Sequence, residues 1–251
     1  MAGASSVQPA GTPRGRAVAV LATVLVAALG VAYLAEAVPE WLSVNMFGVD
    51  FRIVESAADR WLHGGGFYLP YQLAGTYVHG EHLGTDSPIL YPPTLLLLLV
   101  PFTVLPAALW WFVPMTVTAW VVSSHRPRPL VWPVLMYLLV FPMSLWEIAT
   151  GNPLMWFTMA LALGTRFGWP AALVILKPTL APFALVGVHR RTWWMAMGVV
   201  AALSLLFLPM WPDYLRVATN MESGRGVLFS LNQFPMMMIP LIAWLGRRPL
   251  T

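Results

Sequence analysis

Cysteine is absent from this sequence of 251 residues, which excludes disulfide bonds, a thiolate nucleophile and cysteine metal ligands. Charge is scarce as well: acidic and basic residues make up 10% of the chain, against about 25% in a soluble globular domain. The glycine-rich phosphate loop, the Gly-x-Ser-x-Gly of serine hydrolases and the His-Glu-x-x-His of zinc peptidases are also missing. These absences argue against soluble nucleotide chemistry and against the common hydrolase sites.

The chain has an excess of apolar residues. Hydrophobic residues make up 59% of it, its mean hydropathy is +0.71, and it contains 13 Trp, a residue enriched where membranes meet water. The net charge of +4 fits basic cytoplasmic loops, because no basic stripe interleaved with aromatics suggests a nucleic-acid partner. We therefore predict an all-α, polytopic bundle of transmembrane helices with membrane lipids as neighbours.

The first apolar run covers residues 17–38 and follows a polar segment, residues 1–16, that holds Arg14 and Arg16. The run is too long for the core of a signal peptide and long enough to cross a bilayer. We expect a retained first span in a plasma membrane, preceded by a disordered cytoplasmic tail. Residues 17–251 then form one transmembrane domain.

Two polar stretches are expected on the outer side. The first, residues 39–88, contains FRIVESAADRWL, whose apolar residues recur at helical spacing; this predicts an amphipathic helix lying at the membrane interface, ended by Gly64 to Gly66. The second covers residues 212–234.

Further apolar blocks cover residues 89–124, 130–149, 153–165, 169–188, 193–211 and 235–246. Together with the first run they predict about seven or eight membrane segments. Two short spans joined by a turn is the preferred interpretation of 89–124, and one kinked span is the alternative. Arginines between the blocks should lie on the cytoplasmic side of the membrane. If 89–124 crosses the membrane twice, however, Arg126 lies on the outer side. Arg166 or Arg190 falls outside if 169–188 crosses once, unless that block is a re-entrant hairpin with Lys177 at its tip.

Polar residues inside apolar blocks are candidates for function. Lys177 is the clearest one, because it precedes Pro178 in ALVILKPTLAPF and a cation at a helix break suits an anionic group such as phosphate; a lysine that snorkels to the interface is the alternative. Asn152 follows Glu147 in LWEIATGNP and suits a sugar hydroxyl, although Gly-Asn-Pro is also an ordinary turn sequence.

Other candidates lie at the ends of spans. Tyr91 in Tyr-Pro-Pro opens an apolar run, as interface anchors do. Asp50, next to the first span, is placed to act as a general base near the membrane surface, although a loop acid is ordinarily just solvated. A metal site was considered for the four histidines His63, His79, His82 and His125, but their spacing matches no metalloenzyme motif, so no metal ligand and no cofactor is assigned.

The order of these features resembles the glycosyltransferase 87 family, membrane mannosyltransferases of the GT-C fold that use polyprenol-phosphate-mannose. The matching pieces are VDFRIVESAADRWLHGGGFYLPY, YPPTLLLLLVPFTVLP, GNPLMWFTMALALG, AALVILKPTLAPFALVGVHRRTW and SLNQF. They run in order along residues 48–234. The family's Gly-Gln-x-Asn is reduced here to Gly151-Asn152, and its Asn-Gln-Ser is Asn232-Gln233-Phe234.

The resemblance implies a reaction and assigns roles. A hexose, mannose by expectation, would move with inversion from a polyprenyl phosphate to a lipid or glycan acceptor at the outer leaflet. Asp50 would be the base. Lys177, helped by Arg60 or Arg225, would hold the donor phosphate, and the substrate cavity would be lined by Tyr68, Tyr91, Asn152, Asn232 and Gln233.

Two alternatives stay open. A transporter or lipid-binding membrane protein would also explain broken helices and a lysine inside an apolar block, although we find no repeated halves. Members of the family are usually longer, so an inactive, truncated remnant is the second alternative.

Overall fold

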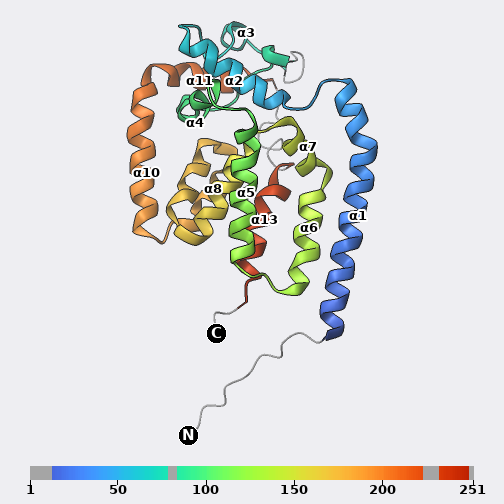
Figure 1. Ribbon diagram of the computed structural model, residues 1–251. Coiled ribbons are helices and arrows are strands. Elements are labelled where there is room, and N and C mark those ends of the chain that lie inside the picture. The colour runs from blue at the N-terminus through green and yellow to red at the C-terminus, as the bar shows by residue number, and fades with distance from the viewer. Residues whose placement is uncertain (1–12, 79–83, 223–231, 249–251) are drawn as a thin grey trace.

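The computed structural model describes residues 13–78, 84–222 and 232–248. Within these ranges all regular structure is helical, apart from two isolated β-bridges. Figure 1 shows upright helices capped at one end by shorter ones. The α-helices are α1 Pro13–Ser43, α2 Val49–Leu62, α3 Pro70–Ala74, α4 Leu96–Leu99, α5 Ala108–Ser124, α6 Trp132–Val140, α7 Pro142–Thr150, α8 Leu154–Phe167, α9 Ala181–Ala184, α10 Arg191–Ser204, α11 Trp211–Asn220 and α13 Phe234–Leu245.

Helix α1 is longer than the predicted span 17–38, because it starts at Pro13 and continues to Ser43. The first outer loop, predicted from residue 39, therefore begins after residue 43. α1 packs along α6 (Figure 1), and a side chain at Gly30 would meet Val140. The close approach of two backbones at a small residue is typical of helix contacts in membranes.

Helix α2 confirms the predicted amphipathic helix in the first polar stretch. It begins after Gly48, which has a positive φ of 67°, and Gly64 with φ 82° follows its end. Phe51, Val54 and Ala58 are buried as the spacing predicted, whereas Leu62 is 46% exposed. Figure 1 places α2 beside α3 and α11 at one end of the bundle.

Residues 89–124 form two helical pieces that meet at a sharp bend. The Pro93–Thr103 segment meets α5 at 114° and packs against α2, so it lies at the α2 end instead of running beside α5. Pro101 and Pro106 interrupt the helical hydrogen bonds between the two pieces. By length and composition the two pieces together could form one bent span, and α5 ends at Ser124, two residues before Arg126.

Residues 169–188 form the hairpin that the sequence analysis considered. A 3₁₀ helix, Trp169–Leu176, leads to Lys177, which has extended backbone because Pro178 follows it. The chain then returns through Pro178–Leu180, α9 and Leu185–Gly187. The guanidinium of Arg190 donates to the carbonyl of Arg166 over 2.8 Å, so both ends of the hairpin meet.

Arginines gather at the end of the bundle opposite α2. We call this the arginine end; its residues are Arg126, Arg128, Arg166, Arg190, Arg191, Arg247 and Arg248. The Arg128 N–H donates to the carbonyl of Gly246, and Arg166 donates to Ser124. Helix α1 starts at this end too (Figure 1). These arginines therefore lie at one end of the bundle.

By length and composition, two stretches of the described chain could cross a membrane, Pro13–Ser43 and Arg191–Asn220, or up to four if each bent pair of helices counts as one span. The bent pairs are Pro93–Thr103 with α5 and Pro129–Val140 with α7. The described chain also has three apolar helical stretches that are shorter than a full span: Leu154–Phe167, Pro178–Gly187 and Phe234–Leu245. The fold is consistent with a membrane protein, with fewer long helices than predicted.

Candidate functional site

Asp50 lies in the first turn of α2 and is held by two side chains from a distant part of the chain. The Thr150 hydroxyl donates to Oδ2 of Asp50 over 2.9 Å, and the Asn152 amide donates to the same oxygen over 2.8 Å. Both hydrogen bonds end on Oδ2. Among the described residues no hydrogen bond to Oδ1 is observed, so Oδ1 is the oxygen that remains for a ligand.

The backbone between α7 and α8 is shaped to present these two donors. Gly151 ends α7 with a positive φ of 74°, a conformation that favours glycine. The indole N–H groups of Trp110 and Trp111 donate to the carbonyls of Gly151 and Ile148, each over 2.7 Å. The Gly48 N–H donates to the carbonyl of Ala149 over 2.9 Å. The start of α2 and the end of α7 are therefore fixed to each other.

Lys177 takes part in a second chain of hydrogen bonds. Its ammonium donates to Oε1 of Gln233 over 2.5 Å, and the Gln233 amide donates to Oε1 of Glu147 over 3.0 Å. Gln233 is 1% exposed and Glu147 is 4% exposed. Glu147 lies in α7, one turn before Thr150, so α7 connects this chain of contacts to the Asp50 group.

Tyr91 lies between the two groups. The ammonium of Lys177 is 5.5 Å from the centroid of its ring, a distance suited to a cation–π contact. Burial raises the pKa of the Tyr91 phenol, and the negative charges of Asp50 and Glu147 raise it further. The Tyr68 hydroxyl donates to the carbonyl of Tyr91 over 2.9 Å. Tyr68 is itself buried, and this hydrogen bond fixes the backbone at Tyr91.

We call Asp50, Tyr91, Glu147, Thr150, Asn152, Lys177 and Gln233 the polar cluster. Four of these were singled out from the sequence as separate candidates: Asp50, Tyr91, Asn152 and Lys177; Gln233 came from the family resemblance. The structure brings all five together from five segments far apart in the chain. It places two acids and one lysine among mostly apolar helices. Ionisable side chains in such surroundings cost free energy, so they mark a candidate functional site.

Other predicted residues are not part of the polar cluster. Arg60 donates to the carbonyls of Gly66 and Phe67 in the glycine turn after α2; its assignment to phosphate binding stays a prediction. Asn232 is exposed and makes no contact with the cluster that the structure describes. Arg225 lies outside the described residues, as do His79 and His82.

Two members of the polar cluster were missed as site residues, Glu147 and Thr150. Glu147 carried a usable signal, because it is the one acid in an otherwise apolar block, residues 130–149. Thr150 carried none. Within the described ranges no group of three histidine or acidic side chains could hold a metal ion.

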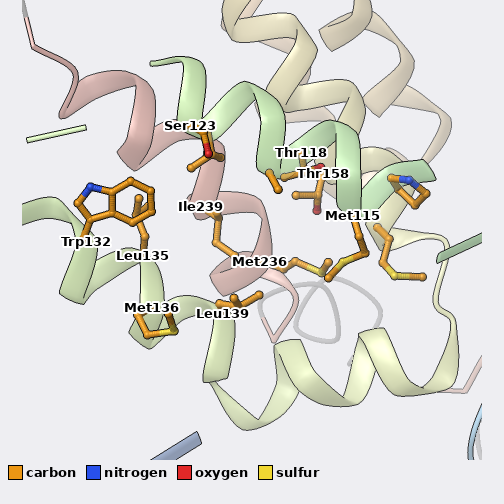
Figure 2. A pocket seen from close by; sticks show the side chains of 14 residues that line it. Met115, Thr118, Ser123, Trp132, Leu135, Met136, Leu139, Thr158, Met236 and Ile239 are labelled. Carbon is orange, nitrogen blue, oxygen red and sulfur yellow. The ribbon is translucent and has the colours of Figure 1, made fainter. Parts of the chain in front are cut away.

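An apolar pocket of about 210 Å³ lies between α5, α6, α8 and α13. Figure 2 shows Met115, Leu139 and Met236 around it, with Trp132 and Ser123 at its other side. Its lining also includes Met155, three residues after Asn152, and Met236 itself is three residues after Gln233. The pocket therefore begins about one helical turn from the polar cluster and reaches the surface, because Ser123 and Trp132 are exposed.

A second pocket, of about 560 Å³, lies beside the start of α2. Gly48, Phe51 and Arg52 line it from α2, and Ile148 and Ala149 line it from α7. These residues flank Asp50 and Thr150 in sequence. No residue of the polar cluster is among the described residues that line the two pockets; each pocket is lined by residues that neighbour the cluster in sequence.

In comparisons with known proteins, no family model, no curated protein and no solved structure matches this chain. The resemblance to the glycosyltransferase 87 family accordingly stays a prediction based on the short motifs.

Proposed function

We propose that this chain is an integral membrane glycosyltransferase, similar to the glycosyltransferase 87 family, that transfers a hexose from a polyprenyl phosphate to a lipid or glycan acceptor. One observation carries the proposal. A carboxylate held by two donors, Asp50, lies in the same polar cluster as a half-buried cation, Lys177. Glycosyl transfer from a phosphate needs these two groups on either side of the reacting carbon.

The proposed reaction is a single displacement. The acceptor oxygen forms a bond to the anomeric carbon while the bond from that carbon to the phosphate oxygen breaks. Oδ1 of Asp50 takes the proton of the acceptor hydroxyl. The leaving polyprenyl phosphate keeps the electron pair, and Lys177 stabilises the negative charge that develops on it. Attack opposite the leaving group inverts the anomeric configuration, and mannose is the expected sugar.

The pockets suit the two lipid-linked substrates. The apolar pocket between α5 and α6 (Figure 2) begins near Gln233 and would take hydrocarbon from the donor while its phosphate meets Lys177. The pocket beside Asp50 would admit the acceptor. Its aromatic wall, Phe51 and Trp111, suits the apolar face of a sugar ring.

We further propose that the protein lies in the plasma membrane with about seven or eight membrane segments, counting the hairpin and the short apolar helices. Arginines concentrate on the cytoplasmic side of membrane proteins. The arginine end would therefore face the cytoplasm, together with the start of α1. The polar cluster, near the α2 end, would face the outer leaflet.

The test is transfer by the purified protein in nanodiscs supplied with labelled polyprenyl phosphomannose and a lipid extract. Wild type should transfer mannose, and Asp50→Asn should lose at least about a thousandfold, because the amide keeps the shape but cannot take the proton. Asp59→Asn is the matched control, since Asp59 is an exposed acid on the same helix. Equal rates for wild type and Asp50→Asn would refute the role of Asp50.

One observation favours the alternative of a transporter or lipid-binding protein: the hairpin broken at Lys177 resembles the interrupted helices that bind substrates in transporters. That function predicts tight binding of polyprenyl phosphate with no transfer by wild type to any acceptor. Movement of the labelled lipid between leaflets of a vesicle would then be the activity to measure.

A further inference from the structure

Glu147 is a buried acid with an unused oxygen. Its side chain is 4% exposed, and Oε1 accepts the hydrogen bond from Gln233. Oε2 is also buried but accepts no hydrogen bond from any residue that the structure describes. A buried carboxyl oxygen without a donor costs free energy that a polar partner would recover. The oxygen therefore needs a partner that the described chain does not supply.

The position of Glu147 indicates which partner fits. It lies in α7 one turn before Thr150, whose hydroxyl is bonded to Asp50, and Gln233 connects it to Lys177. Its charge and that of Asp50 both act on Tyr91. Glu147 is therefore connected to the proposed base along α7 and to Lys177 through Gln233. In the proposed reaction the transferred sugar must lie between these two groups, because its anomeric carbon is attacked on one side and leaves phosphate on the other.

We infer that Oε2 of Glu147 accepts a hydrogen bond from a hydroxyl of the transferred hexose and so selects the sugar of the donor. The inference rests on the proposed function and adds a residue to it. An ionised carboxylate offers only acceptor oxygens, and a sugar ring offers several hydroxyl donors, so the two are complementary. Gln233 fixes the carboxyl group by binding the other oxygen.

The alternative role for Glu147 is to balance the charge of Lys177 through Gln233, with no contact to the sugar. The two roles differ in one measurable respect. A charge-balancing residue affects binding of any donor that carries the phosphate, with or without sugar. A sugar-binding residue affects only donors that carry the hydroxyl concerned.

The experiment measures affinity in nanodiscs for polyprenyl phosphate, polyprenyl phosphomannose and analogues whose mannose lacks one hydroxyl each. The variants are Glu147→Ala and Glu147→Gln, with Glu40→Ala, an exposed acid of α1, as the control. Wild type should lose roughly ten- to hundredfold in affinity for one of the deoxy analogues, the size of a lost hydrogen bond to a charged group. Glu147→Ala should bind that analogue and the full donor equally, and Glu147→Gln should fall between.

The bare phosphate lipid separates the outcomes. If Glu147→Ala binds polyprenyl phosphate as wild type does but binds the full donor more weakly, the inference holds. If its affinity for both lipids falls by the same factor, Glu147 serves Lys177 and the inference is overturned. If wild type binds neither lipid, the proposed function itself fails. If wild type binds both but does not distinguish the deoxy analogues, only the inference fails.

Discussion

Asn152 donates a hydrogen bond of 2.8 Å to Asp50, although 102 residues separate them in the sequence. Thr150 donates to the same oxygen. Two donors on Oδ2 orient the carboxylate and leave Oδ1 as the oxygen that can take a proton. The proposed base is thus positioned by α7 and the turn that follows it.

Removing either donor should weaken transfer without removing the base. We expect Thr150→Val and Asn152→Ala each to lower the transfer rate roughly tenfold, since a hydrogen bond to a charged group is worth about 1.5–3 kcal/mol. Transfer rates measured for the purified variants check this. Thr219→Val, at an exposed position of α11, should leave the rate unchanged.

Lys177 is the single lysine of the chain; the other 13 basic residues are arginines. Lys177→Met should abolish binding of polyprenyl phosphate, because it removes the cation and leaves Oε1 of Gln233 without its donor. Lys177→Arg should retain weak binding, since the charge remains but the larger guanidinium disturbs the contacts with Gln233 and Tyr91. Affinities in nanodiscs measure both effects. Undiminished binding by Lys177→Met, with Arg216→Met as the control for loss of an exposed cation, would place the phosphate elsewhere.

Gly151 should tolerate no side chain. A Cβ there would lie 2.6 Å from Trp111 and 2.9 Å from Phe51, in addition to the strain of its positive φ. We expect Gly151→Ala to destabilise the protein by about 2–4 kcal/mol and to lower transfer, because Thr150 and Asn152 flank it. Thermal unfolding in detergent checks the first effect. Gly198→Ala in α10, where a Cβ meets nothing within 4 Å, should be neutral or slightly stabilising.

The contact between α1 and α6 depends on Gly30. A Cβ at Gly30 would lie 2.5 Å from Cγ1 of Val140, so Gly30→Val should force the two helices apart and lower the melting temperature by several degrees. Ala28→Val, at an exposed position of the same helix, should have no such effect. Equal melting temperatures for the two variants would contradict the packing of α1 on α6.

Local patterns were sufficient to predict helices but not the way in which they meet. The apolar spacing around Phe51 predicted α2, and the prolines predicted the breaks at Lys177 and near residue 101. The 114° angle between Pro93–Thr103 and α5 could not be predicted, because it follows from packing against α2. Counting apolar blocks also overestimated the number of long helices, since several blocks are bent or form one hairpin.

The same limit applies to the site. Lys177 and Asp50 stood out because charge is rare in this chain, and the arginines correctly predicted the hairpin as the way to keep Arg166 and Arg190 together. Thr150 could not be singled out from the sequence, because a threonine in an apolar segment is common and its partner lies 100 residues away. The contact of Arg60 with the glycine turn after α2 was not predicted, because the resemblance assigns Arg60 only a possible role at the donor phosphate.

The most direct test of the account is a structure of Asp50→Asn in nanodiscs with polyprenyl phosphomannose bound, since this variant should bind the donor without turnover. We predict the phosphate within hydrogen-bond distance of the Lys177 ammonium, the mannose between Lys177 and residue 50, and the start of the polyprenyl chain in the pocket between α5 and α6. A donor whose phosphate lies away from Lys177, with its sugar out of reach of residue 50, would contradict the central claim.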